Sequence, residues 1–500
     1  MVYLAAGVSG LTSIVGTFFI KDFLDLSAAF VAGLAFWAGL PWVMKMPLGH
    51  LVDLIWRWKE ALVWLGATLI AASMLIMYAL LSMPEFMEPV MPAEAWYVLA
   101  VILAPTGYVL QDVVADAMTV EAVPTHAPDG TEYPEVQSKA MHTTMQTLGR
   151  IAIISGLVLV AVFNLVLFSG IGEIGPAEQA AVYAKVYLAA LIIPLVSISG
   201  VMLHRFLLRR SRQPSAAETE KTAPDWYLLG GGLIFAAGSV TLGLLDFDYG
   251  QETIFLCSLA IISFLIARLM RELSPESAKA LIGTALIIFV FRAVPLPGPG
   301  LSWFEIDELG FDEQFFSLLS LITACLTMVG LFVLRPMMAK RSIAFIVVVL
   351  TIAAAVLSLP NISLYYGLHE WTAPRSDGIV DARFIAILDT AIESPLGQIA
   401  MVPMLAWIAR NAPPHLKATF FSVMASFTNL ALSASSLGTR YVNDFFVVTR
   451  QVTDPLTGAI ETSANYENLG HLLILVAVLG LAFPLMTVAL IQVSRFRTNA

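Results

Sequence analysis

The stretch GYVLQDVVADAMTVE, residues 107–121, decides the fold of this chain because it places Asp112 and Asp116 in a strongly apolar segment. The two residues are four positions apart, so on a helix they share one face. At bilayer depth a charged carboxylate that faces lipid costs about 2.5–3.5 kcal/mol. We therefore expect this helix to belong to a membrane bundle, with the pair facing a cavity or a cationic partner.

The composition is that of a polytopic membrane protein. Of the 500 residues, 58% are hydrophobic and 13% are charged, and the mean hydropathy is +0.81. A water-soluble core of this size has no means of burying so much apolar surface. The net charge of −10, without a basic patch outside the loops, gives no indication of a nucleic-acid partner. Both cysteines fall in apolar segments, so no disulfide framework is expected.

Fourteen apolar segments are long enough to cross a bilayer as helices. They lie near residues 2–20, 28–50, 61–82, 95–120, 138–168, 180–207, 226–245, 252–270, 278–300, 313–334, 342–360, 382–409, 416–446 and 468–494. With a cytoplasmic N-terminus, eighteen of the 27 Lys and Arg residues fall on the cytoplasmic side, five fall outside and four lie within spans. The sequence thus predicts an all-α protein of the cell inner membrane with both termini in the cytoplasm.

The chain also shows an internal repeat. The pair at 112 and 116 recurs as Asp389 and Glu393 at the same spacing, and two further short matches follow the same order. The sequence therefore predicts a 6+2+6 arrangement: an N-terminal six-helix bundle (1–208), a cytoplasmic linker (209–225), an inserted two-helix hairpin (226–272) and a C-terminal six-helix bundle (273–500). Parallel six-helix repeats with a substrate held near the midplane are typical of the major facilitator fold.

Basic residues inside the predicted spans are candidates for a functional site. Arg150 needs an anion, and the carboxylates of the fourth span are the nearest candidates in the topology. Arg292 precedes a Pro- and Gly-rich break that either lines a cavity or only forms an outer loop. Lys45 either takes part in gating or extends its ammonium to the interface. Glu121, near the predicted cytoplasmic mouth, is a further gating candidate.

The thirteenth predicted span carries a regular polar stripe. Its members recur at spacings of four and three residues, on one helical face: Ser422, Ser426, Asn429, Ser433, Ser436 and Arg440. Such a stripe fits a water-lined pathway, in which Asn429 and Arg440 contact substrate, or a tight helix interface made of small residues. Trp37 and Trp42 in the second span are either packing residues or a stacking surface for a planar ligand.

Signatures of catalysis are missing from the sequence. It contains no Walker loop, GxSxG, HExxH, CxxC or dinucleotide-binding glycine motif. We therefore expect neither an enzyme nor an ATP-driven pump, and no metal or cofactor.

Several stretches resemble the folate–biopterin transporter family of the major facilitator superfamily. They are PWVMKMPLGHLVD (41–53), QDVVADAMTVE (111–121), FRAVPLPGPGLSWFEIDELGFD (291–312) and ESPLGQIAMVPMLAWIARNAPPHLKATFFSVMASFTNLALSASSLG (393–438). The resemblance implies secondary transport of pterins or folates, with protons, and places Lys45, Asp112, Asp116 and Arg292 in family motifs. The inserted hairpin departs from the twelve-helix members and is similar to that of fourteen-helix peptide transporters.

The resulting hypothesis is a monomeric, proton-coupled symporter for a folate- or pterin-like planar anion, working by alternating access. In this hypothesis Arg150, Arg292 and Arg440 neutralise the substrate carboxylates, and Trp37 or Trp42 stacks against the ring. Asp112 and Asp116 carry the proton. Further candidates for coupling or gating are Lys45, Glu121, Asp389 and Glu393. Two alternatives remain open: a permease for muropeptides or other peptide-like anions, and a non-transporting assembly factor or sensor, in which the polar stripe would pack dry against a helix.

Overall fold

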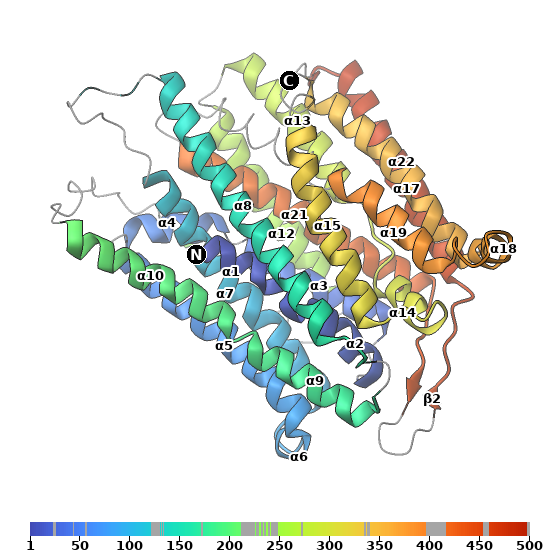
Figure 1. The fold of residues 1–500 in the computed structure, drawn as a ribbon. Coiled ribbons are helices and arrows are strands. Elements are labelled where there is room, and N and C mark those ends of the chain that lie inside the picture. The colour runs from blue at the N-terminus through green and yellow to red at the C-terminus, as the bar shows by residue number, and fades with distance from the viewer. Residues whose placement is uncertain are drawn as a thin grey trace. The chain divides into compact units, whose positions relative to one another are not determined.

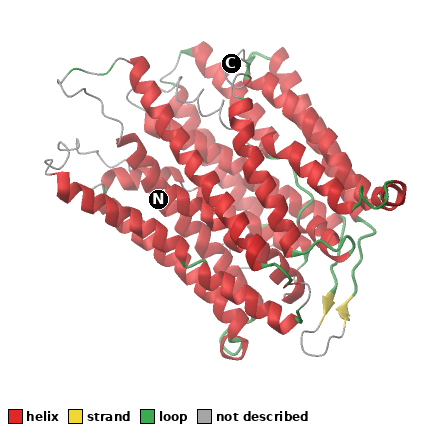
Figure 2. Cartoon of the chain, viewed as in Figure 1, coloured by secondary structure: helices red, strands yellow, loops and turns green. Residues whose placement is uncertain are grey.

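The computed structural model is almost entirely helical (Figure 2). It describes residues 1–23, 27–43, 45–55, 58–121, 131, 133, 135–171, 174–211, scattered positions between 226 and 241, and then 249–271, 274–334, 337, 341–396, 417–453 and 460–497. Within these residues the strands are confined to a two-stranded antiparallel hairpin, β1 (Val452–Thr453) and β2 (Ile460–Thr462). The prediction of an all-α membrane protein is therefore confirmed.

Ten helical segments among the described residues are long and apolar enough to cross a membrane: Val2–Ile20, Ala28–Gly49, Lys59–Ser82, Ala93–Asp116, Leu148–Leu167, Glu178–Leu207, Gly250–Arg268, Glu313–Gly330, Ile343–Tyr365 and Leu469–Val493. Each coincides with a predicted span, and the remaining four of the fourteen are not confirmed. Residues 226–245 and the second half of 382–409 lie mostly outside the described residues. The other two predicted spans, 278–300 and 416–446, contain helices that have too many charged or polar residues to count as candidate membrane spans.

The described residues divide into two compact units. Unit 1 comprises residues 1–15, 44–167 and 174–234, and unit 2 comprises 16–43, 168–173 and 235–500. Residues 28–43 of the second predicted span are grouped with most of the C-terminal half of the chain, because they pack against a helix of that half.

Unit 1 is built on six main helices: α1 (Val2–Val8), α5 (Lys59–Ser82), α7 (Ala93–Glu121), α8 (Glu135–Leu167), α9 (Pro176–Ala189) and α10 (Ile192–Ser211). Helix α5 packs along α7, and a side chain at Gly66 or Gly107 would come within 2.5 Å of the opposite backbone. Glycine is required at this crossing, as is common between membrane helices. Buried Gln111 on α7 donates to the Val63 carbonyl and accepts from Ser197, joining α5, α7 and α10.

Unit 2 contains α2 (Ser13–Phe23, from residue 16), α3 (Ala28–Val43), α12 (Gly250–Met270), α13 (Pro275–Arg292), α14 (Pro299–Asp307), α15 (Glu313–Val333), α17 (Ile343–Tyr365), α19 (Ala382–Glu393), α21 (Lys417–Phe445) and α22 (Leu469–Val493). Helix α3 lies along α21, with α12 against both, and α17 lies beside α22 (Figure 1).

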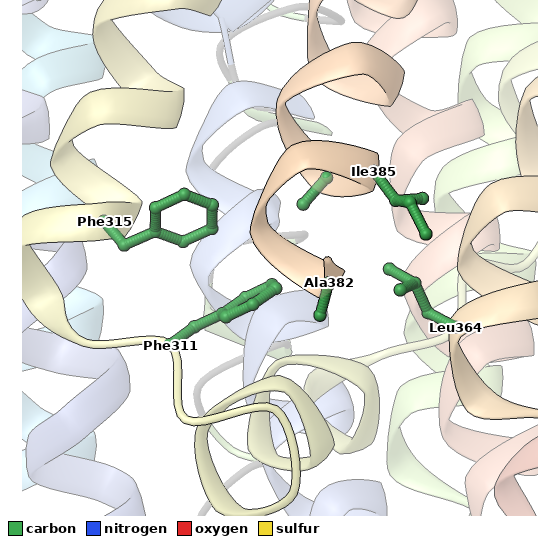
Figure 3. Packing of buried hydrophobic residues seen from close by; sticks show 6 residues of the cluster. Phe311, Phe315, Leu364, Ala382 and Ile385 are labelled. Carbon is green, nitrogen blue, oxygen red and sulfur yellow. The ribbon is translucent and has the colours of Figure 1, made fainter. Parts of the chain in front are cut away.

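An apolar cluster joins α15, α17 and α19 near the start of α19. The rings of Phe311 and Phe315 lie 4.6 Å apart by centroid and point toward Ala382 and Ile385, with Leu364 on the other side (Figure 3). Helix α19 begins at an Asp381 cap that accepts from the Phe384 amide. These contacts fix the position of α19 and of the side chains one turn further along it.

Candidate functional site

One lysine joins the two carboxylates of α7 in unit 1. Lys45 belongs to α4 (Lys45–Leu54), and its Nζ lies 2.6 Å from Asp112 Oδ2 and 2.5 Å from Asp116 Oδ2. The three side chains are 14%, 19% and 31% exposed, so Asp116 is the most accessible of them. The i,i+4 spacing is what allows both carboxylates to reach one ammonium group. We call this group of three the Lys45 clamp.

Residues of two further helices, α1 and α8, interact with the aspartates of the clamp. The Tyr3 hydroxyl of α1 donates to Asp116 Oδ1 at 2.5 Å. Its ring lies over Gly149 of α8, where a side chain would come within 2.9 Å of the ring. Arg150, the next residue of α8, acts electrostatically on Asp112. The clamp and Arg150 together carry two positive and two negative charges, which compensates carboxylates that would otherwise be costly in the bilayer.

The structure thus brings together four predicted site residues from three separate predicted spans: Lys45, Asp112, Asp116 and Arg150. The side chain of Glu121, the last residue of α7, lies outside the described part of the chain. Sequence reasoning missed Tyr3. The available signal was a phenol two residues into an apolar span, where its hydroxyl needs a hydrogen-bond partner.

The polar stripe of α21 faces α3. Asn429 donates to the Trp42 carbonyl at 3.1 Å, and a side chain at Gly39 would come within 3.6 Å of the Ser433 hydroxyl. Ser426 and Ser433 are 0% and 2% exposed, and within the described residues neither hydroxyl has a hydrogen-bond partner. We refer to this contact between α3 and α21 as the α3–α21 seam. The close approach of the two helices agrees with the interpretation of the stripe as a helix interface. Buried hydroxyl groups without a hydrogen-bond partner are unusual in an interface that never opens.

Two further predicted binding residues, Arg440 and Trp37, belong to the helices of the seam. Arg440 approaches Asp444 at 3.7 Å, and a side chain at Gly33 would lie within 3.2 Å of Arg440 Cδ. Trp37 packs edge-on against Phe36, at 5.8 Å between centroids. Arg440 is therefore loosely paired, whereas Trp37 takes part in helix packing as well as in any ligand contact.

Arg292 ends α13 at the predicted helix break, and the break is held by a second polar face of α21. The Ser435 hydroxyl donates to the Val294 carbonyl at 2.6 Å, and Thr439 accepts from the Leu296 amide at 2.9 Å. Asn443 donates to the Pro297 carbonyl at 3.2 Å. Gly298 follows with a φ of +77°, a conformation that favours glycine. Non-helical backbone at membrane depth needs such partners.

Sequence reasoning missed these three holding residues. Ser435, Thr439 and Asn443 recur at four-residue spacing, one face away from the stripe, which is the signal that could have identified them.

The second acidic pair lies on α19 in unit 2. Asp389 is 6% exposed and accepts from Asn361 of α17 at 3.2 Å, whereas Glu393, the last residue of the helix, is exposed. Within the described residues, no group of three or more His, Cys, Asp or Glu side chains is placed to hold a metal ion.

Comparison with known proteins identifies the family. The model of the BT1 family matches residues 6–498. A folate-biopterin transporter from Synechocystis sp. is 24% identical over 434 residues, covering 86% of this chain and 71% of the relative.

Solved structures of transporters share the fold. A POT family transporter in complex with 5-aminolevulinic acid has a TM-score of 0.65 and 14% identity, covering 99% of this chain and 96% of its own. A mutant of the nucleoside transporter NupG has a TM-score of 0.54 and 12% identity, covering 98% and 95%. At these identities the likeness shows the fold alone. The chain is a multi-pass membrane protein of a transporter family rather than an enzyme, and it belongs to the BT1 (folate-biopterin transporter) family.

Proposed function

We propose that this protein is a secondary active transporter that moves a folate- or pterin-like planar organic anion together with protons, by alternating access. The family and the name of the Synechocystis relative supply the substrate class. The Lys45 clamp is the observation that carries the coupling proposal, because an ionic cluster inside membrane helices marks a substrate or ion pathway by default.

The clamp is suited to act as a charge-controlled gate. With both carboxylates ionised, Lys45 holds α4 to α7, while the Tyr3 hydrogen bond holds α1 to the same helix. A proton on either aspartate removes one of the two attractions on Lys45 and leaves the clamp and Arg150 together with an excess positive charge. That excess favours an anion nearby, which links proton uptake to binding of an anionic substrate.

The α3–α21 seam supplies the moving part of the proposal. A buried hydroxyl without a hydrogen-bond partner costs about 1–3 kcal/mol. Ser426 and Ser433 would recover that energy in a state where the seam is open to water or substrate. The seam then lines the pathway in one state and is closed in the other, which reconciles the two interpretations of the polar stripe.

Substrate recognition is assigned to the basic and aromatic residues of the predicted spans. Arg150, Arg292 and Arg440 would attract the carboxylates of the substrate, with Asn429 as a polar contact, and Trp37 or Trp42 would stack against its ring. Arg440 is well suited to this role because its 3.7 Å approach to Asp444 leaves guanidinium donors for a ligand. The proposal includes a monomer in the inner membrane with both termini cytoplasmic, consistent with the distribution of Lys and Arg.

Uptake by the purified protein in liposomes tests the function. Labelled folate should accumulate when the lumen is more alkaline than the outside, and an excess of unlabelled pterin should compete. Folate uptake no higher than in protein-free liposomes would refute the substrate assignment, and uptake that ignores the pH gradient would refute the coupling. Competition by an anhydro-muropeptide but not by pterin would favour the peptide-like substrate.

Chemical labelling separates a transporter from a non-transporting assembly factor. The test uses Ser433→Cys in a chain whose two natural cysteines are replaced by serine. A water-soluble, membrane-impermeant thiol reagent should label position 433 during turnover, because the seam opens to water. A cysteine that stays unlabelled with and without substrate would show a permanently dry seam and contradict transport along it.

A further inference from the structure

Asp389 is a buried carboxyl group for which the described residues provide one hydrogen-bond donor. It is 6% exposed and follows Ile385 of the apolar cluster by one helical turn. Its Oδ2 accepts from Asn361 Nδ2 at 3.2 Å, and its buried Oδ1 has no hydrogen-bond partner among the described residues. A buried ionised carboxylate ordinarily accepts several hydrogen bonds or pairs with a cation.

Among the described residues, the elements that pack most extensively against α19 contain no basic side chain to serve as that cation. They are α15, α17 and the short helix η5 (Ser394–Leu396). Helix α17 and η5 have no charged residue, and the charged residue of α15 is Glu313 in its first turn. On α19 itself, Arg383 lies nearly two turns earlier and approaches Asp312 at 3.6 Å. The next basic residue along the chain is Arg410.

The charges that do act on Asp389 are negative. Glu393 follows on the same helix, and Glu305 of α14 interacts with Asp389 electrostatically. Helix α14 is outside the candidate spans. Desolvation, with a smaller effect from the negative charge of Asp389, raises the pKa of Glu305 to about 7. A buried carboxyl group that faces a neutral amide and the negative charge of another carboxylate is favoured in its uncharged form.

The two acidic pairs of the repeat therefore differ in how they are compensated. Asp112 and Asp116 share Lys45, whereas Asp389 meets the amide of Asn361. We propose that Asp389 is a proton-binding site of unit 2, separate from the Lys45 clamp, in which the proton resides on Oδ1 and Asn361 positions the carboxyl group through Oδ2. The proton adds to a carboxylate oxygen and leaves from it to water, so no other bond forms or breaks.

This inference rests on the proposed function in one respect, namely that proton binding at Asp389 drives transport. It assigns a driving proton to Asp389, in addition to the proton that controls the gate formed by the Lys45 clamp.

Infrared spectroscopy of the purified full chain tests proton binding without using transport. Spectra recorded between about pH 5 and about pH 9 should contain a carboxylic acid band that persists near neutral pH. Because the pKa of Glu305 is also raised to about 7, the variants are compared in a chain that carries Glu305→Gln. In that chain the band should disappear in Asp389→Asn and remain in Glu370→Gln, which removes an exposed carboxyl group elsewhere in unit 2. A band that is unchanged in Asp389→Asn would overturn the proposal, as would a band that is absent at neutral pH in the wild type. Unfolding curves of both variants check that they are folded.

Transport measurements in liposomes test the coupling. Asp389→Asn should still exchange internal for external folate, which needs no net proton movement, and should lose the accumulation driven by a pH gradient. Accumulation equal to that of the wild type would refute the coupling role, and so would accumulation in the wild type that requires a sodium gradient instead. A wild type that exchanges no folate would refute the substrate assignment, and the infrared result would still decide the proton site.

Discussion

Replacement of Lys45 by methionine is the most informative perturbation of the clamp. At distances of 2.6 and 2.5 Å, and with an effective dielectric constant of about 20, each contact has a Coulomb attraction of about 6 kcal/mol before desolvation is subtracted. Removing one partner of a buried ion pair costs about 3–5 kcal/mol. Because Asp116 is 31% exposed and partly screened, we expect the lower end, a loss of about 3 kcal/mol in the free energy of unfolding.

The assay is reversible unfolding in mixed detergent micelles, followed by tryptophan fluorescence. Lys185→Met, which removes an exposed lysine from α9 of the same unit, serves as the matched control and should change stability by less than about 0.5 kcal/mol. The double variant Lys45→Met/Asp112→Asn restores charge balance and should recover a substantial part of the loss. If Lys45→Met unfolds like the control, or if the double variant is additive, then the clamp does not stabilise unit 1 and the reasoning fails.

Three further perturbations test other parts of the account. Because the pKa of Glu305 is raised from 4.5 to about 7, the folded chain binds this proton more tightly, so stability should fall as pH rises from about 4.5 to about 7. Glu305→Gln should flatten this dependence in thermal unfolding, and an unchanged slope would contradict the assignment. Tyr3→Phe should lower stability by about 1–2 kcal/mol by removing a hydrogen bond to a charged group, measured by the same micelle unfolding, and no change would argue against the contact. Thr439→Val should cost about 1–3 kcal/mol by leaving the Leu296 amide without its acceptor, and faster exchange of that amide hydrogen would check the cause.

The sequence was most informative where burial is costly. Charged residues inside apolar segments are rare enough to demand partners, so the residues of the clamp could be identified before their geometry was known. That Lys45 would contact both acids could not be deduced, because Arg150 was an equally good partner by charge and only the packing of α4 against α7 distinguishes the two bases.

Neutral partners were harder to predict for a physical reason. Tyr3 and Asn361 are ordinary residues of apolar helices and become significant only through the carboxylates that they face. The same holds for Asn443, whose role depends on a distant Pro–Gly break. The grouping of α3 with α21 likewise follows from side-chain packing, which a hydropathy pattern does not encode.

Proton movement caused by substrate alone is the most direct test of whether folate entry is coupled to protons. Liposomes containing the protein and an internal pH indicator receive external folate, with no pH gradient and no membrane potential imposed. Folate entry should acidify the lumen. In Asp389→Asn the acidification should be lost while folate exchange persists. Folate entry without any change of internal pH would contradict proton coupling. Acidification in Asp389→Asn equal to that of the wild type would contradict the assignment of a driving proton to Asp389.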